Sequence, residues 1–275
     1  MCTIYDKLKN IEQWKKYYPL DDKYYLFDSN IIYSCSKIVD LYYQMCNARM
    51  GLHFYCDYEE YDMFGIDKVS VLVGKKYFLE NALLYYNFSV DYLWQVLWLR
   101  YTNCDDISGL STTEKYFREM KFCSFEGLRY GLTVLGERKL VGVLDNFFSD
   151  RNKLYGDLRQ KYNALKHRAV FHTPGLGMNN RNSMFAISVS NEKEQDFSNI
   201  RGYTIPLVTR EEVDLDKLKE WLIEFDNQFV DLCEYFFDII IPKEYLKDNS
   251  LDLLAAINYV RIHQKELDEF RDKKL

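Results

Sequence analysis

The residues best suited to chemistry lie between Asp150 and Asn182. This segment holds seven basic and two acidic residues, a net charge of +5 in a chain whose overall net charge is −6. The rest of the chain is therefore at −11, and the segment is a basic island in an acidic protein. Local basic charge of this kind predicts a partner that carries phosphate groups. An acidic chain is not a general coat for nucleic acid, so any such binding would be confined to this region.

The periodicity of this segment predicts a helix over Asp150–Arg168, with Ser149 or Asp150 as its N-cap. Winding the helix at about 100° per residue separates a packing flank from a polar flank. The side chains expected to pack are Leu154, Leu158, Tyr162 and Leu165. The polar side chains that share the flank of Arg159 are Asn152, Asn163, Lys166 and, farther round, His167.

These residue types are the minimal equipment for RNA cleavage without a metal. A histidine titrates near neutral pH, so His167 could deprotonate a ribose 2′-OH, which then attacks the adjacent phosphorus. Arg159 and Lys166 could neutralise the charge that grows on the phosphate, and Asn163 could orient either group. A helix with a basic outer face is, however, most often an ordinary solvated helix, and this alternative stays open.

The stretch Tyr162-Asn163-Ala164-Leu165-Lys166-His167 resembles the signature of the HEPN superfamily. That signature is an Arg, often followed directly by Asn or Asp, and a His a few residues later. Asn163 and His167 match it by position, whereas Tyr162 stands in place of the Arg. Arg159 lies one turn earlier and Arg168 lies directly after, so either could reach the same phosphate. The direct match covers about twenty residues, within a helical pattern that is compatible over much of the chain.

The resemblance implies an all-α bundle, commonly a homodimer, that acts on RNA in toxin or phage-defence systems. Active members are metal-independent endoribonucleases, so no metal and no cofactor is expected. In this reading His167 is the general base, Asn163 orients, and Arg159 or Arg168 stabilises the pentacoordinate phosphorus. The RNA contacts expected in a cleft shared by two protomers come from Lys166, Arg168, His172 and Asn152.

Two other functions remain open at this point. Because Tyr162 carries no permanent positive charge, the chain could be a non-catalytic module that binds RNA, a nucleotide or a protein partner. It could also be a purely structural helical scaffold in which the Asp150–Arg168 helix is ordinary surface. Salt-dependent RNA affinity without cleavage would favour the module, and absence of any nucleic-acid binding would favour the scaffold.

The elements that must position this helix are mostly helical. Few glycines (12) and prolines (4) favour long helices. Helical patterns cover Lys23–Gly51, Lys75–Thr102, Ser111–Glu114 onward, Gly136–Phe148, Asp214–Ile241 and about 250–270. The Asp214–Ile241 helix carries a seam that steps by four and three residues, comprising Leu218, Leu222, Phe225, Phe229, Leu232, Phe236 and Ile239.

Together these patterns predict an all-α antiparallel helical bundle with an inserted β-hairpin. The hairpin is expected at about 183–209, where two alternating stretches flank a charged loop. Residues 1–70 form an N-terminal helical part that could pack on the core, and residues 71–275 form the HEPN-like bundle. The stretch Tyr55–Asp62 is expected to be a solvated loop, with Gly51 as the C-cap of the helix before it.

Other signals set the environment of the protein. The seven cysteines are scattered and odd in number, which predicts a reducing compartment rather than a disulfide framework. The apolar stretch Tyr77–Tyr101 is interrupted by charged residues and predicts a buried helix rather than a membrane span. The chain is therefore expected in the cytoplasm. Glu137 occupies the lysine position of a phosphate-binding loop, and His53 with Cys56 makes only half a zinc site, so neither motif is met.

Overall fold

The protein is described by a computed structural model. The structure describes residues 4–20, 23–61, 67–101, 116–117, 120–149, 152–167, 171–176, 182–188, 201–207, 212–247, 257–258, 260–262 and 264. The α-helices are α1 (Lys23–Leu26), α2 (Ser29–Tyr61), α3 (Lys68–Tyr101), α5 (Phe125–Val134), α6 (Arg138–Phe148), α7 (Lys153–His167) and α8 (Leu215–Ile240). Short 3₁₀ helices span Ile4–Lys7, Glu12–Tyr17 and Lys243–Leu246. The predicted all-α character is confirmed for this part of the chain.

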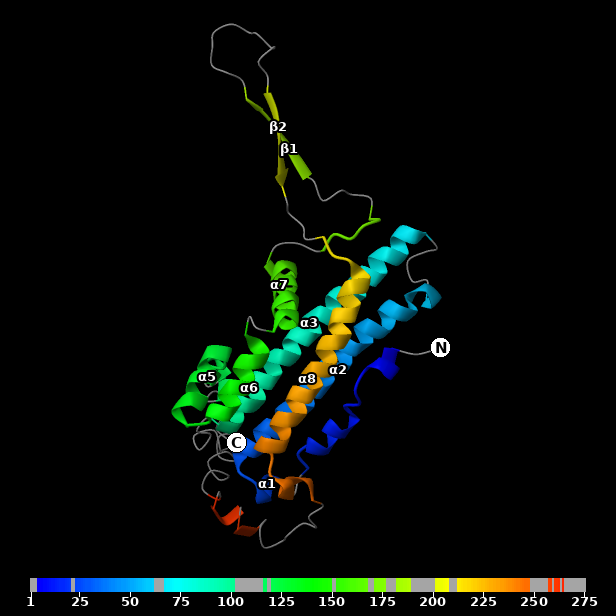
Figure 1. Ribbon diagram of the computed structural model, residues 1–275. Coiled ribbons are helices and arrows are strands. Elements are labelled where there is room, and N and C mark those ends of the chain that lie inside the picture. Colours follow the sequence, from blue (N-terminus) through cyan, green and yellow to red (C-terminus); the bar gives the residue numbers. More distant parts are fainter. Residues whose placement is uncertain are drawn as a thin grey trace, which may run out of the picture.

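Three long helices form the centre of the molecule (Figure 1). Helices α2 and α3 lie side by side and antiparallel, and α8 packs on α3. Helix α3 also contacts α5 and α7, so it is the central element, as its nearly uniform apolar surface predicts. None of the helices in the described ranges is long and apolar enough to cross a membrane.

A buried ion pair joins the three central helices. Arg49 of α2 donates from Nε and Nη2 to the two carboxylate oxygens of Asp226 on α8, at 2.9 and 2.6 Å. The hydroxyl of Tyr86 on α3 donates to the same carboxylate at 2.7 Å. A carboxylate without solvent needs such partners, because an unpaired buried charge is strongly unfavourable. The network therefore fixes the relative register of α2, α3 and α8.

Helix α2 extends ten residues beyond the end predicted for it. Gly51 is not a C-cap, because the helix continues through it to Tyr61, and Tyr55 is a buried helical residue rather than part of a loop. A Cβ at Gly51 would lie 2.8 Å from the Phe78 carbonyl oxygen and 3.0 Å from the Ala82 Cβ on α3. The glycine therefore serves the close approach of two helices, which its sequence position alone does not reveal.

The seam predicted for α8 is confirmed except at its end. Leu218, Phe229, Phe236 and the other seam residues are buried, but Ile239 is 43% exposed. Asp214 caps the helix, since its side chain accepts a hydrogen bond from the Lys217 backbone N–H at 3.1 Å. The helix ends at Ile240, two residues before Pro242, as the restriction that proline places on its predecessor predicts.

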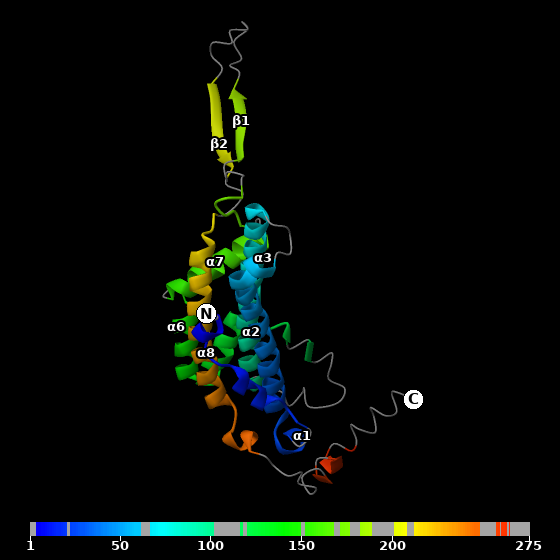
Figure 2. The ribbon, with the colours of Figure 1, turned by 90° about the vertical axis from the view of Figure 1, so that its right-hand side faces the viewer.

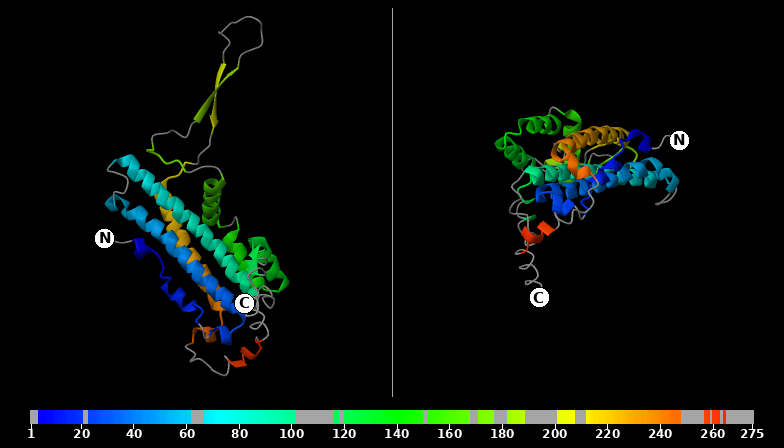
Figure 3. Two further views of the ribbon diagram at one scale, coloured as in Figure 1. Left: turned by 180° about the vertical axis from the view of Figure 1, so that it is seen from behind. Right: turned by 90° about the horizontal axis from the view of Figure 1, so that it is seen from below.

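Helices α5, α6 and α7 cover one side of the long helices (Figure 3). Helix α5 contacts α3 and α6, and α7 contacts α3, α6 and α8. Ser124 caps α5 by accepting from the Gly127 N–H at 3.0 Å. This group places α7, the helix that carries the basic residues, against the middle of the bundle.

Two strands stand beyond one end of the bundle (Figure 2). Strand β1 (Asn182–Ser188) pairs antiparallel with β2 (Arg201–Leu207) in a register that sets Asn182 opposite Leu207. The segment before them is fastened to α3, because the Phe171 N–H donates to Glu80 at 2.9 Å and the Lys76 ammonium donates to the Phe171 carbonyl at 3.1 Å.

The N-terminal 3₁₀ helices and α2 share one continuous buried cluster with the other helices. Trp14, for example, meets Phe237 of α8 edge to face, with ring centroids 5.2 Å apart. The described residues between Ile4 and Tyr55 thus contribute to the common core. The predicted capping box at Ser111–Glu114 and most of the predicted C-terminal helix lie outside the described residues.

Candidate functional site

Helix α7 presents the candidate residues. It begins at Lys153 rather than at the predicted Asp150, and Asn152 is its N-cap, with its side-chain oxygen accepting from the Tyr155 N–H at 3.3 Å. Asn152 therefore has a structural role in starting the helix, and the RNA contact predicted for it stays a prediction. The packing flank is confirmed: Leu158 and Tyr162 are buried, and Leu154 and Leu165 pack partly buried against the core.

Arg159 is held in place by contacts on two sides. Its Nη1 donates to the side-chain oxygen of Asn87 on α3 at 3.0 Å. Its guanidinium carbon also lies 5.0 Å from the centre of the Tyr162 ring. Because Asn87 is buried and uses its amide nitrogen on the Leu83 carbonyl at 2.9 Å, its oxygen is a fixed acceptor.

Lys166 lies over the same aromatic ring. Its ammonium is 5.8 Å from the centre of the Tyr162 ring, which is itself only 5% exposed. Such contacts between a cation and a ring face are attractive and keep the charged group near the surface while its stem packs. We call Arg159, Lys166 and the Tyr162 ring that carries them the cation pair.

Asp91 on α3 is the acidic neighbour of the cation pair. Partial burial raises the pKa of its carboxyl, and the charges of Arg159 and Lys166 oppose that rise. The negative charge of the Asp91 carboxylate weakens the positive potential at this surface. Among the described residues, no hydrogen bond to this carboxylate is present. Asp91 therefore interacts electrostatically with both cations.

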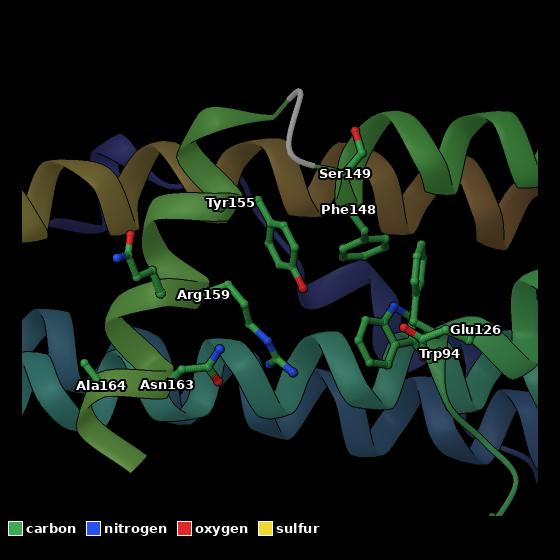
Figure 4. A pocket seen from close by; sticks show the side chains of 11 residues that line it. Trp94, Glu126, Phe148, Ser149, Tyr155, Arg159, Asn163 and Ala164 are labelled. Carbon is green, nitrogen blue, oxygen red and sulfur yellow. The ribbon is translucent and has the colours of Figure 1, made fainter. Parts of the chain in front are cut away.

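A cavity of about 460 Å³ opens beside Arg159 (Figure 4). Helix α7 contributes Arg159, Asn163 and Tyr155, and the facing wall holds Trp94 of α3. The complete set of lining residues is Trp94, Phe125, Glu126, Phe148, Ser149, Tyr155, Gly156, Arg159, Gln160, Asn163 and Ala164. Its volume lies within the range of small-molecule pockets, which are typically aromatic with a few polar groups.

Two polar groups of the lining residues stand out. The indole N–H of Trp94 is buried and has no hydrogen-bond partner among the described residues. Burial raises the pKa of the Tyr155 hydroxyl to about 12, so this hydroxyl remains protonated at neutral pH. Buried polar groups are nearly always paired, so the indole N–H is an exception, but its nitrogen has almost no exposed surface and does not open into the cavity.

The other predicted site residues do not all lie together. Asn163 is exposed and lines the cavity with Arg159, whereas His167 is exposed at the last residue of α7 and is not among the cavity-lining residues. Arg168 lies outside the described residues. The structure thus brings together Arg159, Asn163 and Lys166 on one side of α7 and places His167 at the end of the helix.

His172 is buried and does not lie on the surface with the other predicted site residues. It is 8% exposed, its carbonyl accepts from the Val213 N–H at 2.8 Å, and it forms a β-bridge with Glu212. The clamp on Phe171 by Glu80 and Lys76 holds this part of the chain against α3. The side chain predicted to contact RNA is therefore packed where an RNA backbone would not reach it.

Sequence reasoning missed the residues that α3 contributes. Trp94 of α3 lines the cavity. Asn87 and Asp91 were visible only as polar interruptions of an apolar helix, one turn apart. That spacing was the available signal, since polar residues on a buried helix commonly face a partner or a site.

Among the residues that the structure describes, no three potential ligands of the His, Cys, Asp or Glu type gather to hold a metal ion. Comparison of the chain with protein-family models, with curated proteins and with solved structures finds no match.

Proposed function

We propose that this protein is a HEPN-like helical module that binds RNA through α7 without cutting it. The observation that carries the proposal is the cation pair: Arg159 and Lys166 both lie over the buried Tyr162 ring, at 5.0 and 5.8 Å. A buried ring beneath two cations holds both charges at one place on the surface. Two neighbouring cations at a fixed position suit a phosphate backbone.

The charge distribution supports a local rather than a general site. The segment from Asp150 to Asn182 carries +5 while the chain as a whole carries −6, so polyanions are repelled elsewhere. Arg159 is held by Asn87, and its planar fork offers further N–H donors to phosphate oxygens. The exposed Asn163 stands between the two cations along α7 and adds a polar group to the same surface.

The position of Tyr162 argues against catalysis. It occupies the place of the arginine in the HEPN-like motif, yet its side chain is 5% exposed and points into the packing flank. A phenol in the core cannot stabilise charge on a phosphate. Arg159, the cation that could replace the motif arginine, lies one turn before that position. Its hydrogen bond to α3 fixes its place, so it is not set to contact the phosphate at which His167 would act.

Binding and cleavage are tested together with a mixed RNA pool in EDTA. The proposal predicts salt-dependent affinity, intact RNA, and weaker binding by the Arg159→Gln and Lys166→Gln variants. A log–log plot of affinity against salt should show the slope expected of a few phosphate contacts. Absence of binding at low salt by the folded protein would contradict the proposal and favour a structural scaffold.

A metal-independent endoribonuclease is the second candidate, and the helix face favours it in one respect. Asn163 and His167 are both exposed and lie one turn apart on α7. The HEPN-like motif has its Asn and its His in the same order along the chain. In this case His167 would act as general base, with Arg159 stabilising the pentacoordinate phosphorus. Products ending in 2′,3′-cyclic phosphate, lost in His167→Ala, would establish cleavage and refute the non-catalytic proposal.

A homodimer is part of the same proposal. HEPN-like pairing would set two α7 helices across a shared cleft and double the number of cations that face one RNA. Light scattering on the eluting protein should then give twice the chain mass of 33.0 kDa. A monomer that still binds RNA would leave each cation pair acting alone.

A further inference from the structure

We infer that the cavity beside α7 takes one unstacked base of the bound RNA, which makes the protein selective for single strands. This inference rests on the proposed RNA binding and adds the class of RNA that is bound. Its starting point is that Arg159 belongs both to the cation pair and to the cavity lining. A phosphate bound by the cation pair therefore has its base within reach of the cavity.

The walls of the cavity suit a flat ring. Trp94 lies against Phe125 and Phe148, with ring centroids 5.5 and 5.6 Å apart, and Phe148 meets Tyr155 at 5.1 Å. These four rings come from α3, α5, α6 and α7, and all of them line the cavity. Figure 4 shows three of them, Trp94, Phe148 and Tyr155. Aromatic surfaces of this kind stack single-stranded bases with little dependence on sequence.

The polar groups suit the edge of a base. The edges of bases carry both hydrogen-bond donors and acceptors. The side-chain amides of Gln160 and Asn163 line the same cavity and offer both donors and acceptors.

The arrangement excludes a base that remains paired. The cavity lies between α3, α5, α6 and α7, so a base must leave its stack to enter. Unstacking costs least in a single strand. A duplex RNA of equal length has more densely spaced phosphates, and these would contact the cation pair. Its bases would stay paired and would leave the cavity unused.

The test compares binding of a single-stranded RNA and its duplex, at several salt concentrations, by fluorescence anisotropy. The wild-type protein should bind the single strand with about tenfold higher affinity than the duplex, which is the contribution expected of one stacked base. Trp94→Phe keeps a ring but offers a smaller surface for stacking, and Phe148→Leu removes part of the wall. Both should weaken single-strand binding by about threefold to tenfold and leave duplex binding unchanged.

The matched control is Trp221→Phe on α8, which alters a partly buried tryptophan that does not line the cavity. It should bind both RNAs as the wild type does, and thermal unfolding by circular dichroism should show that all variants fold. Equal affinity for the two RNAs, or equal effects of Trp94→Phe and Trp221→Phe, would overturn the cavity assignment while RNA binding stands. Absence of salt-dependent binding to either RNA would overturn the proposed function itself.

Discussion

The guanidinium of Arg159 on α7 is hydrogen-bonded to the side-chain oxygen of Asn87 on α3, 3.0 Å away. This bond joins the helix that carries the cations to the central helix of the bundle. It also places Arg159 at the boundary between the cation pair and the aromatic cavity. The two residues therefore determine where an anion and a ring could be bound together.

Replacing Asn87 and replacing Arg159 should weaken RNA binding in different ways. Arg159→Gln removes a charge, so the slope of log affinity against log salt should fall by about one phosphate contact. Asn87→Ala keeps that charge but frees the side chain that bears it, so affinity should fall about twofold to fivefold with little change of slope. Equal slopes for the two variants would show that Arg159 does not contact phosphate.

Lys166 should contribute to RNA binding through its charge alone. Lys166→Gln is expected to reduce the salt slope by about one contact and to weaken binding of all RNA sequences equally. Lys139→Gln on α6 is the control, because Lys139 also lies over a tyrosine ring, that of Tyr235, at 5.9 Å. A loss of the same size in Lys139→Gln would mean that the overall charge of the protein, rather than the cation pair, governs affinity.

Asp91 should make both stability and RNA binding depend on pH. Burial raises the pKa of its carboxyl, so the folded protein holds this proton more tightly than the unfolded chain does. Ionisation therefore costs stability as the pH rises through the folded pKa, and the cost is absent below the unfolded pKa. Asp91→Asn should raise the melting temperature at about pH 7 and change it little at about pH 3, below both pKa values.

The same substitution should tighten RNA binding at neutral pH, because it removes a negative charge beside Arg159 and Lys166. The control is Asp28, which is exposed, directly precedes α2 and is remote in sequence from Asp91 and α7. Asp28→Asn should show neither effect. If Asp91→Asn lowers the melting temperature at neutral pH, the attraction of the two cations outweighs the cost of burial.

The buried ion pair between Arg49 and Asp226 should dominate the stability of the bundle. Asp226→Ala leaves the Arg49 charge without its partner and should lower the free energy of unfolding by about 3–5 kcal/mol. Tyr86→Phe removes one hydrogen bond to the same carboxylate and should cost about 1–2 kcal/mol. Urea unfolding of the three proteins measures both values, and a larger effect of Tyr86→Phe would contradict this order.

Local patterns were sufficient for the helices whose signals lie within a few turns. The seam of α8, apart from Ile239, and the packing flank of α7 follow from side-chain spacing, and the structure confirms them. The sequence was misleading at Gly51, where a residue typical of helix ends lies inside α2. The reason is non-local: the nearest atoms to a Cβ there belong to Phe78 and Ala82 of α3.

The amino-acid sequence by itself determined that α7 is amphipathic, that its polar flank is basic, and that Asn163, Lys166 and His167 are presented on it. Only the tertiary structure decided that Arg159 is held by Asn87, that Trp94 faces a cavity, and that His172 is buried. The physical reason is distance along the chain. Spacing fixes the neighbours of a side chain on its own helix, whereas its partners on other helices are set by how the whole core packs.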